Sequence, residues 1–189
     1  STINFWGAFS LKGILQKLGF SSVQVTLSIL VYCLSFVFVN FWPWYNHSVF
    51  IFQLVATNFL LSHLETQTKF KKHIYLFFAA FFVVVAIFTK QDGGGLALVS
   101  VSILMMYVAL ADRAYKWFGF YSLYVIFITL IFILPFLPYD FLYWFNYGQA
   151  PHNARTSIND ILIDVFEGSQ WLKFYLLVWV IIVLKKLNA

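Results

Sequence analysis

The residues best suited to chemistry gather in one polar stretch, QAPHNARTSINDILIDVFEGSQ, which is flanked by long apolar segments. In it, His152 can carry a proton near neutral pH, and Arg155 can pair with an anionic lipid headgroup. Asp160 and Asp164 lie one helical turn apart, a spacing at which two carboxylates can hold a divalent cation. The candidate catalytic residues are therefore His152, Arg155, Asp160 and Asp164, and the candidate binding residues here are Asp160, Asp164 and Glu167.

A short amphipathic helix over 158–167 would position these carboxylates. Ser157 precedes Asp160 by three residues, as in a capping box, and Gly168 is placed to end the helix. The apolar residues recur at i, i+3, i+4, i+7 and i+8: Ile158, Ile161, Leu162, Val165 and Phe166. Asp160 and Asp164 fall on the opposite face together with Glu167. A solvated acidic surface would show the same pattern, and this plainer interpretation stays open.

Composition indicates that the rest of the chain lies in a lipid bilayer. Hydrophobic residues make up 62%, aromatic residues 22% and charged residues only 10% of the 189 residues. Soluble domains carry about 25% charged residues. A soluble domain of this length could not bury 24 Phe, 11 Tyr and 7 Trp. The basic residues are scattered among apolar segments and form no stripe, which argues against a nucleic-acid partner.

Six apolar segments are long enough to cross the hydrocarbon core as helices. They cover about 22–41, 47–64, 73–89, 95–111, 117–138 and 169–185. Lipid offers no hydrogen-bond partner to the backbone, so only helices or a closed barrel can cross it. These segments are longer than barrel strands and lack their alternation. We predict an all-α integral membrane protein, a bundle of six transmembrane helices in residues 21–189 with an outer loop over 139–168.

The distribution of Lys and Arg predicts the orientation. In a six-span arrangement nine basic residues fall on one side: Lys12, Lys17, Lys69, Lys71, Lys72, Arg113, Lys116, Lys185 and Lys186. The other side receives Lys90, Arg155 and Lys173 and five of the seven acidic residues. Because basic loops stay in the cytoplasm, we predict cytoplasmic termini and an outward-facing loop over 139–168 in a bacterial inner membrane.

Residues 1–20 predict a separate amphipathic helix on the cytoplasmic side. Phe5, Phe9, Leu11, Ile14, Leu15 and Leu18 approximate one apolar stripe, with Lys12, Gln16 and Lys17 opposite. Gly19 is placed to end this helix. A short helix of this kind ahead of a span is expected to lie in the plane of the interface. The alternative is a helix docked on a neighbouring part of the chain.

Inside the spans the sequence offers few polar groups. Gln53 and Asn58 are the further candidate binding residues, and packing between helices is the alternative role for both. No span carries a charged residue at its middle, which argues against a proton-coupled pump. His47, His63 and His73 lie near span ends, and their positions leave open whether they bind a cofactor. We predict no metal or cofactor, and we expect bound lipid.

These observations favour a non-enzymatic subunit or scaffold of a larger membrane complex, with the lipid bilayer and other membrane subunits as partners. The helix over 158–167 would then be an outward-facing docking helix. Two alternatives stay open. One is a membrane-embedded enzyme acting on a lipid-linked substrate at the outer face through His152, Arg155, Asp160 and Asp164. The other is a small transport or substrate-binding subunit with Gln53 and Asn58 in a polar cavity.

Overall fold

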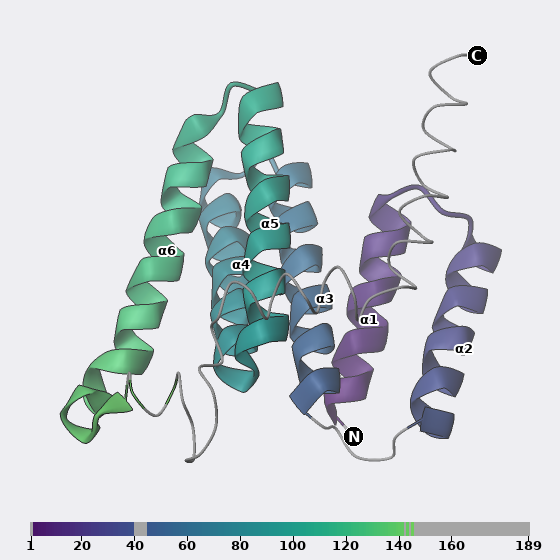
Figure 1. Cartoon of the computed structure of the whole chain (residues 1–189). Helices are drawn as coiled ribbons and strands as arrows, with labels where there is room; N and C mark the ends of the chain where they lie inside the picture. The colour runs from purple at the N-terminus through teal and green to yellow at the C-terminus, as the bar shows by residue number, and fades with distance from the viewer. Residues whose placement is uncertain (1, 40–44, 142, 144, 146–189) are drawn as a thin grey trace, which may run out of the picture. The chain divides into compact units, whose positions relative to one another are not determined.

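The computed structural model describes residues 2–39, 45–141, 143 and 145, and this part of the chain is helical without strands. In order, its elements are α1 (Thr2–Lys17), α2 (Ser22–Val39), α3 (Tyr45–Glu65), α4 (Lys69–Thr89), α5 (Gln91–Ala111), α6 (Tyr115–Ile133) and the 3-10 helix η1 (Leu134–Tyr139) (Figure 1). They belong to one unit, residues 1–142, and a second unit covers 143–189. The predicted helix at 158–167 and the predicted span at 169–185 lie outside the described residues.

Four of these helical segments are long and apolar enough to cross a membrane: His47–Glu65, Lys69–Thr89, Gln91–Ala111 and Tyr115–Tyr139. They correspond to the second to fifth predicted spans. The first predicted span corresponds to α2, which runs from Ser22 to Val39. The prediction of an all-helical fold with segments long and apolar enough to cross a membrane is confirmed for the described residues, and the count of six spans stays a prediction.

The break between α1 and α2 is specified locally. Gly19 has a φ of +81°, a left-handed conformation that suits glycine at the end of a helix. Its N–H donates to the Gln16 carbonyl at 3.0 Å, and the Phe20 N–H donates to the Leu15 carbonyl at 3.1 Å. This pair of bonds is a Schellman motif, so Gly19 ends α1 as predicted. Ser21 and Gln24 then form a reciprocal capping box at the start of α2.

The turn between α4 and α5 depends on Gly94. Lys90 is extended, with a φ of −158°, and α5 begins directly after it. A Cβ at Gly94 would collide with the backbone of Ile87, so only glycine allows α5 to start this close to α4. The predicted span begins near 95, whereas α5 already begins at Gln91, so Gly93–Gly95 belong to the first turns of this helix.

The fifth predicted span, 117–138, divides into α6 and η1. Pro135 lacks an N–H and cannot donate to the carbonyl four residues before it, so the regular α-helical bonding ends at Ile133. A single 3-10 stretch carries the chain on to Tyr139. The apolar composition correctly indicated one continuous helical segment, while the proline decided its internal geometry.

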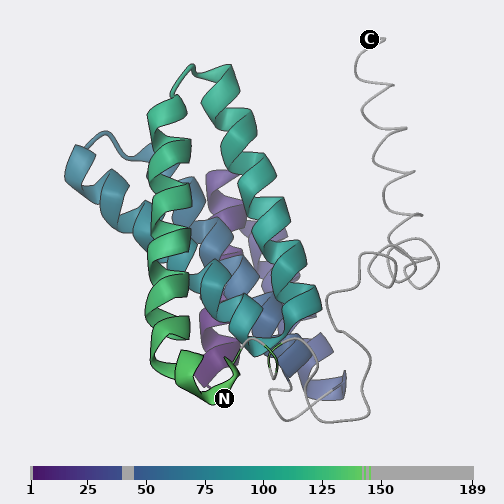
Figure 2. The ribbon, with the colours of Figure 1, turned by 60° about the vertical axis from the view of Figure 1, so that its left-hand side comes forward.

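The core lies between α3 and α4, which pack against each other more extensively than any other pair of the described helices. Ala56 on α3 and Ala79, Ala80 and Ala86 on α4 are fully buried, and small residues of this kind let helix backbones approach closely. Large rings fill the remaining space: the Phe59 ring stacks on Phe82 with centroids 5.9 Å apart. α5 and α6 pack against α4, and the two lie side by side in both ribbon views (Figures 1 and 2).

α1 packs lengthwise against α3. A Cβ at Gly7 would meet Ile51, and a Cβ at Gly13 would meet Asn58, so the contacts advance together along both helices and the two run parallel. The contact face includes Gly7, Ser10 and Ile14, which are buried, whereas Phe5 and Phe9 of the predicted apolar stripe point outward. The structure thus shows α1 docked on α3, which is the alternative that the sequence left open. That α1 lies in the plane of a membrane interface stays a prediction.

Candidate ligand site at the basic end of the bundle

Most residues proposed from the outer loop lie outside the described part of the chain. His152, Arg155, Asp160, Asp164 and Glu167 are all in this group, so the predictions made for them remain predictions. The other two candidates, Gln53 and Asn58, lie on α3. Both are partly exposed.

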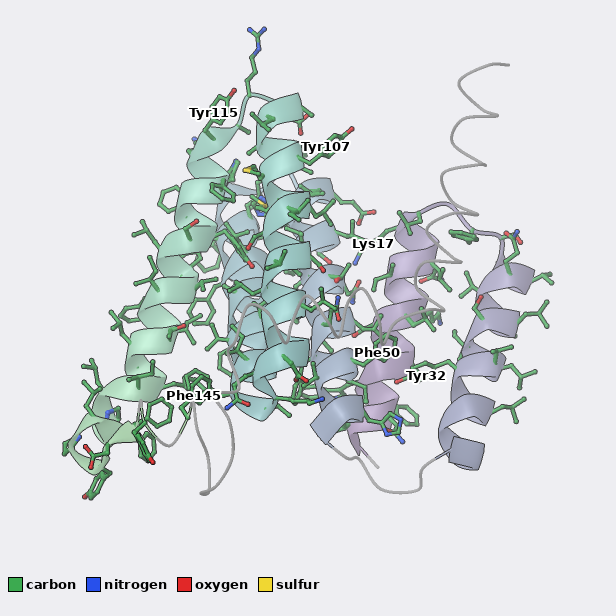
Figure 3. All side chains as sticks on the ribbon, viewed as in Figure 1. Lys17, Tyr32, Phe50, Tyr107, Tyr115 and Phe145 are labelled. Carbon is green, nitrogen blue, oxygen red and sulfur yellow. The ribbon has the colours of Figure 1, made fainter. Side chains whose placement is uncertain are left out.

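Asn58 belongs to a polar contact between α1 and α3. The Lys17 Nζ lies 2.5 Å from the Asn58 side-chain oxygen, 3.2 Å from its carbonyl oxygen and 2.7 Å from the Ser62 hydroxyl. Lys17 points from the end of α1 toward α3 (Figure 3). Gly13 leaves room for Asn58, because a Cβ there would come 2.6 Å from the amide oxygen. The arrangement matches the packing role that the sequence analysis left open for Asn58.

The surroundings of Lys17 shift the pKa of its ammonium group. Partial burial lowers the pKa of Lys17 below its ordinary value of 10.5, and the nearby Glu65 carboxylate opposes this effect. The protonated amine still has three oxygen acceptors, so the cation is supported although it is partly removed from water. Lys17 is the last residue of α1 and lies outside the four membrane-length segments.

A cavity of about 290 Å³ opens at the same end of the bundle. The ends of four helices enclose it: His63 and Leu64 come from α3, Lys72 from α4, Met105, Val108 and Ala109 from α5, and Trp117 from α6. Asp112 and Ala114 complete the lining from the turn between α5 and α6. The walls are therefore mostly apolar, and three ionisable residues line them: an imidazole, a lysine and a carboxylate. This is the usual make-up of a small-molecule site.

His63 is held in a fixed orientation within this lining. Only 2% of its surface is exposed, and its Nδ1 lies 2.9 Å from the Lys72 carbonyl oxygen. Because a carbonyl can only accept, Nδ1 carries the proton and donates it. In the neutral ring Nε2 is then the acceptor. Trp117 packs edge-on against the imidazole with centroids 4.9 Å apart, which fixes the ring further.

Trp117 is the centre of the cluster. Lys72 Nζ lies 5.7 Å and Lys116 Nζ 5.5 Å from its ring centroid, within the range of cation–π attraction. The His73 ring also contacts the indole, at 5.0 Å, while its Nδ1 bonds the Tyr124 hydroxyl at 2.8 Å. One indole therefore gathers two lysines and two histidines from three helices.

Positive charge dominates this end of the molecule. Lys69, Lys71, Lys72, Arg113 and Lys116 lie around the cavity end, with Glu65 and Asp112 as the acidic residues there. Within residues 2–39 and 45–141, the ion pair with N···O under 4 Å is Lys90–Asp92 at 2.9 Å. It lies where α4 meets α5, at the end of these helices away from the cavity. The five basic residues around the cavity thus have no carboxylate partner in the described part of the chain.

In the sequence, His63 and His73 flank a basic stretch, and Trp117 follows it 44 residues after His73. Nothing in their spacing indicated that α5 would supply Met105, Val108 and Ala109 to close a cavity between them. A cluster of two histidines and three lysines within 63–73, followed by a tryptophan next to Lys116, is the signal that could have indicated the site.

Comparison with protein-family models, curated proteins and solved structures found no match.

Proposed function

We propose that the protein is a non-enzymatic integral subunit, or scaffold, of a larger membrane assembly. The observation that carries this proposal is the exposed apolar face of α2. Its apolar residues at i, i+4, i+7 and i+11 are between 46% and 69% exposed: Val23, Leu27, Leu30 and Leu34. Among the described helices, only α1 packs extensively against α2.

A partner helix would stabilise α2 in a way that lipid does not. Lipid chains are as apolar as leucine, so burial alone does not bring helices together within a bilayer, and close packing contributes most of the association. α2 has such packing on one side, where Val25 and Tyr32 are buried. Tyr32 points toward α1 (Figure 3), and a Cβ at Gly7 would collide with its hydroxyl. A second subunit on the opposite side of α2 would complete its packing.

The experiment compares two exposed apolar positions. A photo-crosslinking amino acid replaces Leu30 on α2 or Leu123 on α6, which is 60% exposed, and the protein is purified in mild detergent. We expect Leu30 to cross-link to a protein that also co-elutes in a fixed molar ratio, and Leu123 to cross-link to lipid. A single chain of about 22 kDa with Leu30 cross-linked only to lipid or to residues 169–185 would contradict the proposal.

The charge distribution supports the orientation within this proposal. The basic residues at the cavity end face the cytoplasm, and the end carrying Lys90, Asp92 and Asp140 faces outward. The predicted loop over 139–168 is then outside with its docking helix, and the C-terminus is cytoplasmic. Because α1 runs parallel to α3 and ends at the basic side, we place the N-terminus outside, in place of the predicted cytoplasmic position. Lys17 then lies at the cytoplasmic headgroup level.

The two alternatives differ in their support. A transport or substrate-binding role needs Gln53 and Asn58 in a polar cavity, whereas Asn58 is occupied by Lys17 and neither side chain lines the cavity at the basic end. The enzyme alternative depends on His152, Arg155 and Asp160 together with Asp164. Alanine at each of those four positions tests it, because an enzyme of this kind would lose turnover of a lipid-linked substrate while keeping normal expression.

A further inference from the structure

We propose that the cavity at the basic end binds the phosphate-containing headgroup of an anionic phospholipid from the cytoplasmic leaflet. The inference rests on the proposed orientation but not on the scaffold role. It gives a place to the bound lipid that the composition led us to expect.

The positive charge beside the cavity is not balanced by carboxylates among the described residues. Lys72 and Lys116 approach one indole ring from two helices, at 5.7 and 5.5 Å from its centroid, and have no carboxylate partner among the described residues. An anion in the cavity would pair with Lys72, which lines it, and Lys116 on the same indole would add to the attraction. Basic pockets between membrane helices on the cytoplasmic side bind acidic headgroups through the same arrangement.

The cavity lining combines polar and apolar side chains. Met105, Val108 and Ala109 form an apolar wall, while Lys72, His63 and Asp112 supply one donor group and two groups able to accept. With Nδ1 of His63 bonded to the Lys72 carbonyl, Nε2 is the nitrogen left for a ligand. A glycerol headgroup carries a phosphate flanked by hydroxyl groups. The ammonium group can pair with the phosphate, and the two acceptor groups can take hydrogen bonds from the hydroxyls.

The cavity also lies at the membrane depth expected for lipid headgroups. The cavity is enclosed by helix ends, and Tyr107 and Tyr115, which are 67% and 59% exposed, project outward at this level (Figure 3). Exposed tyrosines are typical of the headgroup region, where a ring can sit in lipid and its hydroxyl in water. A phosphate in the cavity would therefore be at the depth where phospholipids carry it. The acyl chains would lie along exposed apolar residues of α5, among them Ile103 and Leu110.

The test is native mass spectrometry of the full chain, delipidated in detergent and titrated with phosphatidylglycerol or phosphatidylcholine. We expect preferential retention of phosphatidylglycerol, reduced about tenfold or more in the double variant Lys72→Gln/Lys116→Gln. Lys71→Gln removes one charge from the same end without touching the cavity lining or Trp117, and it should retain the lipid. The double variant Lys72→Arg/Lys116→Arg keeps both charges and should retain the lipid. This variant tests the role of charge even where the glutamine variant folds poorly.

Three outcomes would overturn the proposal. One is equal retention of the two lipids by the wild-type protein. Another is equal loss in Lys71→Gln and in Lys72→Gln/Lys116→Gln, which would indicate general surface attraction. The third is displacement of the lipid by millimolar inorganic phosphate, or binding of inorganic phosphate alone, which would identify a soluble anion as the ligand. None of these results changes the subunit ratio measured for the scaffold role, so the two proposals fail separately.

Discussion

Lys17 on α1 and Asn58 on α3 are joined by two contacts from a single ammonium group, 2.5 Å to the amide oxygen and 3.2 Å to the backbone carbonyl. The second contact uses a carbonyl within α3 as an additional acceptor, and the Ser62 hydroxyl donates to the same oxygen at 2.9 Å. Together they fix the end of α1 against α3 at the basic side of the bundle.

Replacing Lys17 by methionine should destabilise the protein by about 1 kcal/mol, because Asn58 and Ser62 lose a charged donor. Thermal unfolding in detergent, followed by circular dichroism, measures the change. Lys12→Met is the matched control, since Lys12 is on the same helix and exposed. Equal effects of the two substitutions would mean that the Lys17 contact contributes nothing beyond a surface charge.

Lys17 should also give stability a pH dependence. Burial lowers its pKa in the folded state below 10.5, so between the two pKa values the unfolded chain binds more protons than the folded one. The free energy of unfolding should therefore rise with pH over a window that ends near 10.5. The measured quantity is the difference between wild type and Lys17→Met, which cancels the titration of other groups. A difference that is flat across this window, or that falls with pH, would contradict the assigned desolvation.

Gly94→Ala should disrupt the hairpin of α4 and α5, because its Cβ would collide with the Ile87 backbone. Overpacking against backbone costs about 1–3 kcal/mol or more. Gly95→Ala is the control: no atom lies within 4 Å of its Cβ, and the change should stabilise the helix by about 0.5–1 kcal/mol. Monodisperse yield and unfolding temperature report both effects. If Gly94→Ala behaved like Gly95→Ala, the close approach of α5 to α4 would be wrong.

The parallel course of α1 and α3 predicts which side of the membrane each end of α1 faces. In a Cys33→Ser background, Thr2→Cys should react with a membrane-impermeant maleimide in intact spheroplasts. Lys69→Cys, at the start of α4, should react only after permeabilisation. Protection of both positions until permeabilisation would instead support a helix in the plane of the cytoplasmic interface.

The sequence alone determined which segments are helical and apolar. Backbone groups in lipid must bond within their own helix, so the positions of apolar runs, of Gly19 and of Pro135 set the elements without help from distant residues. The helix α5 begins at Gln91, ahead of the predicted span start near 95, because a glycine run is equally compatible with a turn and with a helix packed tightly against its neighbour.

Only the tertiary structure decided what the polar residues do. Lys17 and Asn58 are 41 positions apart in sequence, and no periodicity within either helix indicates that they meet. The cavity likewise requires the ends of four helices to converge on Trp117, and the residues that close it from α5 are ordinary apolar ones. Apolar patterning specifies that a helix is buried or in lipid, but every helix here shares that pattern. The choice of neighbour therefore depends on close packing at positions such as Gly7, Gly13 and Ala80, which is a property of paired surfaces and not of one segment.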